Sequence, residues 1–198
     1  MSAGQPDPTD VASYDAMLDQ VTIGGAQPLT KPIELREYDP EWPLLYEREE
    51  ARIRTILGDR VRRIEHAGST SVPTLPAKPV IDIVLEVPDS ADEPAYVPDM
   101  EEAGYVLQIR EPEWFEHRVF KGPDTNVNLH VFTEGCAEVD RMLLFRDWLR
   151  KDAADRRLYA DAKRELAARD WKYVQQYADA KTAVVHAIMG RAQAEQDA

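Results

Sequence analysis

Residues 64–87 read IEHAGSTSVPTLPAKPVIDIVLEV, and this stretch decides the fold. Residues 61–66, which overlap the start of this stretch, predict a short strand. It ends at the small-residue turn 68–71. Three prolines follow within 72–79 and exclude regular structure there, because each lacks an N–H and restricts the residue before it. Residues 80–87 are apolar and β-branched, which is typical of a buried strand. The stretch therefore predicts two strands joined by a polar turn and an irregular segment.

The turn and the second strand carry the polar groups that suggest chemistry. Gly68 is followed by three hydroxyl residues, Ser69, Thr70 and Ser71. Backbone N–H groups and hydroxyls gathered in this way can hold a phosphate or another anion. Asp82 interrupts the apolar strand, and a carboxylate is costly to bury unless it is paired, hydrogen-bonded or bound to a metal. Asp82 is therefore a candidate metal ligand and catalytic residue, and the alternative is that it accepts hydrogen bonds from the turn and holds the loop.

Several short elements occur together in an order that one family shares. They are EH before the turn, GST-x-VP, AKP-x-ID-I and a later N-L-H-V, with YDPEWP and FRDWLR on either side. Over about residues 33–192 the chain resembles the GrpB family, bacterial proteins assigned to the nucleotidyltransferase-like superfamily. The resemblance implies an α+β fold, a mixed β-sheet flanked by helices with a helical C-terminal segment, in which the turn and Asp82 face a common cleft. In transferases of that superfamily the turn holds a triphosphate and a D-x-D pair holds divalent metal. The resemblance therefore also implies a divalent metal, Mg²⁺ in the first instance. The implied reaction is transfer of a nucleotidyl or phosphoryl group to a small acceptor.

One position departs from the D-x-D pattern. The second carboxylate would stand at position 84, where this chain has Val84. Glu86 shares the face of Asp82 but lies about 13 Å further along the strand, at roughly 3.3 Å per residue, too far to share one metal ion. The missing carboxylate favours an alternative, a non-catalytic ligand-binding or regulatory protein on a degenerate scaffold. Family members fused to dephospho-coenzyme A kinase imply a third role, which no residue of this chain supports independently.

Further residues are candidates for the walls of the site. The resemblance places the L-H-V strand beside that of Asp82, so His130 would share the metal or act as a general base, with a structural role as the alternative. Lys78 and Arg118 would neutralise a phosphate or carboxylate. For Lys78 the alternative is an exposed loop position. The expected substrate-binding set is Gly68, Ser69, Thr70, Ser71, Lys78, Arg118 and His66, of which His66 would orient the turn through a hydrogen bond. Two helical lysines in YADAK motifs, at 163 and 181, could also reach the site, although ordinary exposure is favoured for both.

The remaining sequence predicts the order of the elements. Residues 1–30 are polar and predict a flexible leader, with order as the alternative where VTIGG, residues 21–25, meets the domain. Residues 31–198 predict a single domain, with the sheet ending near residue 135 and helices over 138–194. Strands are expected at 33–38, 105–109, 118–121 and 127–132, a helix at 40–57 that stops at Gly58, and C-terminal helices at 138–150, 153–168 and 171–191.

Composition limits the kinds of partner. The formal net charge is −13, from 24 basic and 37 acidic residues, which disfavours general nucleic-acid binding while leaving room for a small anionic substrate such as a nucleoside triphosphate. The single cysteine excludes an intrachain disulfide.

The sequence lacks the motif GxxxxGK[ST] of P-loop proteins and the motif GxGxxG of dinucleotide-binding proteins, so neither kind of site is predicted. No apolar run approaches the length of a membrane helix and the first thirty residues contain no Lys or Arg, so we expect no membrane partner and a cytoplasmic protein. The sequence leaves the oligomeric state open.

Overall fold

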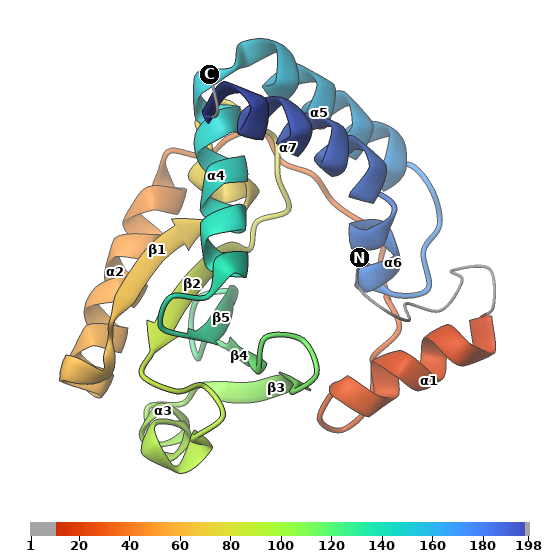
Figure 1. Cartoon of the computed structure of the whole chain (residues 1–198). Helices are drawn as coiled ribbons and strands as arrows, with labels where there is room; N and C mark the ends of the chain where they lie inside the picture. Colours follow the sequence, from red (N-terminus) through yellow and green to blue (C-terminus); the bar gives the residue numbers. More distant parts are fainter. Residues whose placement is uncertain (1–10, 197–198) are drawn as a thin grey trace.

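The computed structural model describes residues 11–196, which are built around a five-stranded sheet (Figure 1). The strands are β1 (Arg63–Ala67), β2 (Ile81–Val87), β3 (Val106–Glu111), β4 (His117–Lys121) and β5 (Val127–Thr133). Their order in the sheet is β1-β2-β5-β4-β3. The β2–β5 pair is parallel and every other pair is antiparallel, so the sheet is mixed and the predicted α+β class is confirmed.

Helices α2 (Glu41–Leu57) and α3 (Val97–Glu102) cover one face of the sheet. Alternate side chains of β2 point to this face, and Ile83 and Leu85 are fully buried there. Helix α2 begins and ends where the sequence predicts. Asp39 accepts a hydrogen bond from the N–H of Glu41 at 2.9 Å, and Gly58 takes a positive φ of 54° just beyond the last turn.

The opposite face is partly covered by helix α4 (Ala137–Lys151), which packs on Ala67, Val84 and Phe132. Helices α5 (Ala153–Ala167) and α7 (Thr182–Gln196) lie side by side beyond the end of α4, with the short helix α6 (Val174–Asp179) below them (Figure 1). Within residues 11–196 none of the helices combines the length and the apolar character needed to cross a membrane.

Two predicted elements are wrong. The helix expected over 171–191 is divided into α6 and α7 by a turn at Ala180 and Lys181, although neither glycine nor proline marks the break. The strand expected over 33–38 is reduced to one bridge, in which Arg36 exchanges two backbone hydrogen bonds with Ala77 at 2.8 and 2.9 Å. Pro76 flanks the bridge on one side, and because a proline donates no backbone hydrogen bond the ladder does not extend.

Residues 11–30 differ from the flexible leader that their composition suggests; residues 1–10 of the leader lie outside the described residues. Helix α1 (Val11–Val21) packs against the C-terminal part of the chain. The buried hydroxyl of Tyr14 donates to Asp179 at the end of α6, with 2.5 Å between the oxygens. Helix α1 is thus ordered because its apolar side chains, among them Tyr14 and Leu18, are buried against other parts of the chain.

After α1 the chain joins the outer strand of the sheet. Thr22 forms a bridge with Ile109, and the N–H of Ile23 donates to the carbonyl of Gln108 at 2.8 Å. At the same point the pairing of β3 with β4 shifts by one residue, between Leu107 and Ile109. This β-bulge sets which side chains of β3 face the site described below.

Candidate functional site

The turn after β1 depends on glycine at position 68. Gly68 has φ 63° and ψ −170°, a combination that residues with a side chain avoid. A Cβ atom added there would also lie 2.3 Å from Asp82 Oδ2 and 2.8 Å from its Cβ. The backbone of the turn therefore passes directly over the Asp82 carboxylate, which only glycine allows.

Two of the three turn hydroxyls hold the turn itself. Thr70 Oγ1 donates to the carbonyl of Val80 at 3.2 Å, and Ser71 Oγ donates to the carbonyl of Gly68 at 2.6 Å. Both side chains are buried. Ser69 is more exposed and interacts with the hydroxyl of Tyr159 on α5. Of the three hydroxyls, Ser69 is the one whose side chain is not buried.

His66 supports the turn from the α2 side of the sheet. Its Nε2 lies 3.0 Å from Thr70 Oγ1, and its ring stacks on Tyr46 of α2 with 4.8 Å between ring centroids. Because Thr70 donates its own proton to Val80, it accepts the proton of His66 Nε2. Burial lowers the pKa of His66 to about 4, so the ring is neutral at physiological pH.

Asp82, near the start of β2, and His130, in the middle of β5, lie together on the opposite face. Asn128 Nδ2 donates to Asp82 Oδ1 at 2.8 Å, and His130 Nε2 lies 3.9 Å from the same oxygen. Burial raises the pKa of Asp82, but the hydrogen bond from Asn128 and the charge of Lys78 help to lower it below its ordinary value. Asp82 is therefore ionised. It keeps 29% of its side-chain surface exposed and His130 keeps 23%, so a ligand can reach both.

Four lysines surround this carboxylate, and we call them the lysine cluster. Its members are Lys78 before β2, Lys121 on β4, Lys163 on α5 and Lys181 before α7, four of the seven lysines in the chain. Burial lowers the pKa of each, to about 8 for Lys181, while the Asp82 charge opposes the change. Among the described residues, lysine ion pairs are formed by Lys151 and Lys172 and not by the cluster. The cluster is thus a local concentration of basic side chains in a protein with a net charge of −13.

The aromatic ring of Tyr177, on α6, lies beside the cluster. The ammonium groups of Lys78 and Lys181 lie 5.6 and 4.3 Å from the centroid of its ring. The side chain is 1% exposed, and its hydroxyl has no hydrogen-bond partner among the described residues. A buried hydroxyl without a partner costs on the order of 1–3 kcal/mol. The ring of Tyr177 thus packs against the lysine ammonium groups, while its hydroxyl lies inside the protein.

Lys163 is tied to the irregular segment between the turn and β2. Its ammonium group is buried and donates to the carbonyl of Pro76 at 2.5 Å. Helix α5 thereby holds the segment that carries Lys78. The exposure favoured for both YADAK lysines on sequence grounds is wrong, because Lys163 is buried and Lys181 is half-buried against Tyr177.

Arg118 is the predicted site residue that the structure places elsewhere. It is in register with Val131, whose side chain belongs to the core under α2 and α3. Since side chains alternate along a strand, Arg118 points away from His130. It is buried, and its Nε donates to Glu93 Oε1 at 2.6 Å. Arg118 therefore does not line the site.

Sequence reasoning missed Lys121 as a site residue. It is in register with Asn128 and donates a hydrogen bond to that residue's Oδ1. Because side chains alternate along β4, Lys121 lies on the same face as His117. This pattern in the sequence could have identified Lys121. Its proximity to Asp82 depends on β5 lying between β4 and β2, and this order is not visible in the sequence.

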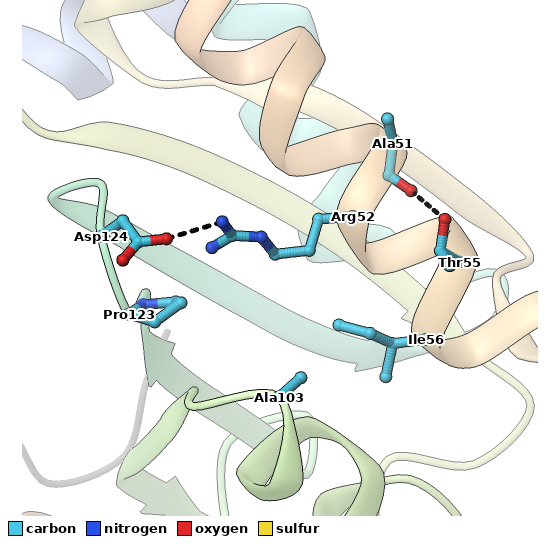
Figure 2. Close-up of a pocket in the computed structure, with 7 residues that line it drawn as sticks. All are labelled: Ala51, Arg52, Thr55, Ile56, Ala103, Pro123 and Asp124. Carbon is cyan, nitrogen blue, oxygen red and sulfur yellow. Dashed lines mark hydrogen bonds and ion pairs between the residues drawn. The ribbon is translucent and has the colours of Figure 1, made fainter.

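A separate hollow of about 570 Å³ lies between α2, the residue after α3 and the β4–β5 turn (Figure 2). Arg52 points into it and pairs with Asp124 at 2.6 Å. The cation in this hollow is thus neutralised by a neighbour, in contrast to the lysine cluster, and the hollow does not adjoin Asp82.

These observations define an α+β protein with a cationic site on one face of a mixed sheet, a fold consistent with the nucleotidyltransferase-like class. The chain belongs to the GrpB family, since the family model described as GrpB protein matches residues 32–191. A UPF0157 protein of Halalkalibacterium halodurans is 59% identical over 180 residues, which cover 91% of this chain and 92% of the relative. A UPF0157 protein of Streptomyces coelicolor is 45% identical over 170 residues, 86% of this chain and 88% of the relative.

A solved structure shows the same fold. The crystal structure of the conserved protein GrpB from Enterococcus faecalis superposes with a TM-score of 0.73 at 27% identity, covering 83% of this chain and all of that one. A more distant relative is named dephospho-CoA kinase, in Mycolicibacterium paratuberculosis, with 31% identity over 164 residues, 70% of this chain and 40% of the relative. That name describes the longer relative.

Proposed function

We propose that the chain binds a nucleoside triphosphate at the lysine cluster and transfers a nucleotidyl or phosphoryl group to a small acceptor. The supporting observation is the gathering of four lysines without ion pairs around one ionised carboxylate, in an acidic chain. Lysine ammonium groups are common phosphate ligands. The partly exposed hydroxyl of Ser69 adds an uncharged hydrogen-bonding group. A small polyanion suits this charge distribution better than a nucleic acid does.

The proposal includes a divalent cation, Mg²⁺ in the first instance. Within residues 11–196 no group of three or more His, Cys, Asp or Glu side chains could hold a metal, so the protein groups alone form an incomplete site. Magnesium is usually bound by one or two carboxylates together with substrate phosphates. Asp82 beside the lysine cluster fits that arrangement, with His130 as a second ligand. When bound, the ion would neutralise charge on the transferred phosphate.

A second candidate function is non-catalytic binding of a small anionic ligand, and Val84 favours it. Val84 occupies the second D-x-D position and is buried against Phe132 and Leu143. Glu86, the next carboxylate on this face, accepts hydrogen bonds from the N–H groups of Gly135 and Cys136 and holds the start of α4. Strand β2 thus supplies one carboxylate to the site. Consumption of the bound nucleotide distinguishes the two functions.

Calorimetric titration with ATP, CTP, GTP and UTP, with and without Mg²⁺, tests the proposal on the wild type and on Asp82→Asn. Without metal we expect the variant to bind triphosphate more tightly, because a negative charge beside four lysines is removed. With Mg²⁺ we expect it to bind more weakly, because a metal ligand is lost. Glu113→Gln, an exposed change, is the control. No binding of any nucleotide by the wild type would overturn the proposal, and unchanged Mg²⁺-dependent binding by Asp82→Asn would remove Asp82 from it.

The lysine cluster makes a further prediction about affinity and pH. Lys181→Met should weaken triphosphate binding roughly 10- to 100-fold, the effect of losing one charge-assisted hydrogen bond. Lys31→Met, at an exposed position outside the site, should not. The pKa of Lys181 is lowered to about 8 in the free protein, and a bound anion would raise it. Affinity should therefore be highest below pH 8 and fall as the pH rises above it, and this fall should be smaller in Lys181→Met.

A further inference from the structure

A row of four titratable side chains crosses the sheet from Asp82 to its outer strand. His130 Nε2 lies 3.9 Å from Asp82 Oδ1. On the other side of the ring, His130 Nδ1 lies 3.0 Å from His117 Nε2, and His117 Nδ1 lies 2.7 Å from Glu111 Oε2. The four residues belong to β2, β5, β4 and β3, which are neighbours in that order. The two imidazole planes are within 8° of parallel, with 5.2 Å between the ring centroids.

His117 is held in place inside the protein. It is 4% exposed, with Trp114 edge-on at 5.0 Å and the Phe132 ring stacked at 4.6 Å. Burial lowers the pKa of His117, although the neighbouring Glu111 opposes the change. Glu111 is 32% exposed and remains an acceptor for hydrogen bonds. His117 thus lies between a carboxylate and a second imidazole.

When both imidazole rings are neutral, the hydrogen bonds determine where each proton lies. A carboxylate only accepts, so His117 carries its proton on Nδ1 and donates it to Glu111. Its Nε2 is left as an acceptor, which requires His130 to carry its proton on Nδ1. The lone pair of His130 Nε2 is consequently directed toward Asp82 and the lysine cluster. Without this row, the carboxylate of Asp82 would favour the opposite tautomer, with the proton on Nε2.

We propose that Glu111 and His117 are positioning residues that fix His130 as its Nδ1–H tautomer and so present the Nε2 lone pair to the ligand. The use of that lone pair, to hold a divalent cation or to accept a proton from the acceptor hydroxyl, rests on the proposed function. The tautomer itself does not, because it follows from hydrogen bonds within the sheet. Second-sphere hydrogen bonds commonly fix a histidine ligand in this way.

Nitrogen-15 NMR of the histidine side chains in the full chain tests the proposal without any ligand. At a pH where the shifts show neutral rings, we expect wild-type His130 to show a protonated Nδ1 and an unprotonated Nε2. In His117→Phe, which keeps an aromatic ring between Trp114 and Phe132, we expect His130 to change to the Nε2–H tautomer. A wild-type His130 already protonated on Nε2, or no change in His117→Phe, would overturn the proposal.

A second pair of variants separates the role of Glu111 from general effects of mutation. In Glu111→Leu the tautomer of His117 is no longer fixed, so both histidines should populate mixed tautomers. Glu113→Leu, two residues away at an exposed position, should leave both spectra unchanged. Absence of nucleotide binding together with the expected spectra would contradict the proposed function alone, whereas nucleotide binding with the wrong tautomer would contradict the positioning role alone.

Discussion

Replacing Gly68 with alanine should destabilise the protein by about 3 kcal/mol or more, from backbone strain and overlap together. The backbone at φ 63° and ψ −170° lies in a region nearly restricted to glycine. In addition, the new methyl group would lie 2.3 Å from Asp82 Oδ2 and 2.9 Å from its Cγ, so the turn or the strand must move. Urea unfolding of wild type and variant measures the difference.

Gly135→Ala is the matched control for this prediction. Gly135 also has a positive φ, 79°, but a Cβ atom there would meet nothing within 4 Å. Only the backbone strain applies, about 1–2 kcal/mol. An equal loss in the two variants would mean that the approach of the turn to Asp82 contributes nothing, and would weaken the case for a site assembled at that contact.

Acidification should destabilise the protein through His66. The pKa of the folded ring is about 4, because of burial, against an ordinary value of 6.5, so between these values the unfolded chain binds more protons than the folded one. Stability is therefore complete above pH 6.5 and falls as the pH decreases toward 4, by up to about 3 kcal/mol for this group. Denaturant midpoints measured between pH 7 and pH 4 follow this loss.

His66→Gln tests the origin of the acid sensitivity. Its amide can still donate to Thr70, whereas the titrating ring is gone, so the variant should lose less stability between pH 6.5 and 4. His186→Gln, at an exposed position on α7, should show the wild-type pH dependence. An unchanged slope in His66→Gln would assign the acid sensitivity to other groups.

The parts of the fold that could be predicted from the sequence are those with strong local signals. These signals depend only on neighbouring residues. They are the Asp-Pro pair at the start of α2, Gly58 at its end, the apolar run of β2 and the absence of proline from the C-terminal helices. The break before Lys181 could not be predicted, because no local residue requires it. Asp179, at the end of α6, accepts a hydrogen bond from Tyr14 of α1, a contact between distant parts of the chain.

The candidate site also combines features that local sequence predicts with features that depend on long-range contacts. The turn and the Asp82 strand adjoin in the sequence, so their meeting could be predicted. The lysine cluster combines residues from four separate elements, and its members meet only through the order of the strands and the packing of α5. Arg118 was misplaced because a pattern of alternating residues does not say which face of a strand is the functional one, and both faces of β4 carry basic side chains. Glu111 is opposite His117 only because of the β-bulge in β3.

The bridge between the segment after α1 and β3 also affects how copies of this protein behave toward one another. β3 is the last strand of the sheet, and an open edge of this kind offers its N–H and C=O groups to any other extended chain. The N–H of Ile23 already binds one of those groups, the carbonyl of Gln108, and the adjacent β-bulge interrupts the regular edge. Both features lessen edge-to-edge aggregation, and the first comes from residues that precede the family-matched region 32–191. A shortened chain could keep its lysine cluster and still lose solubility.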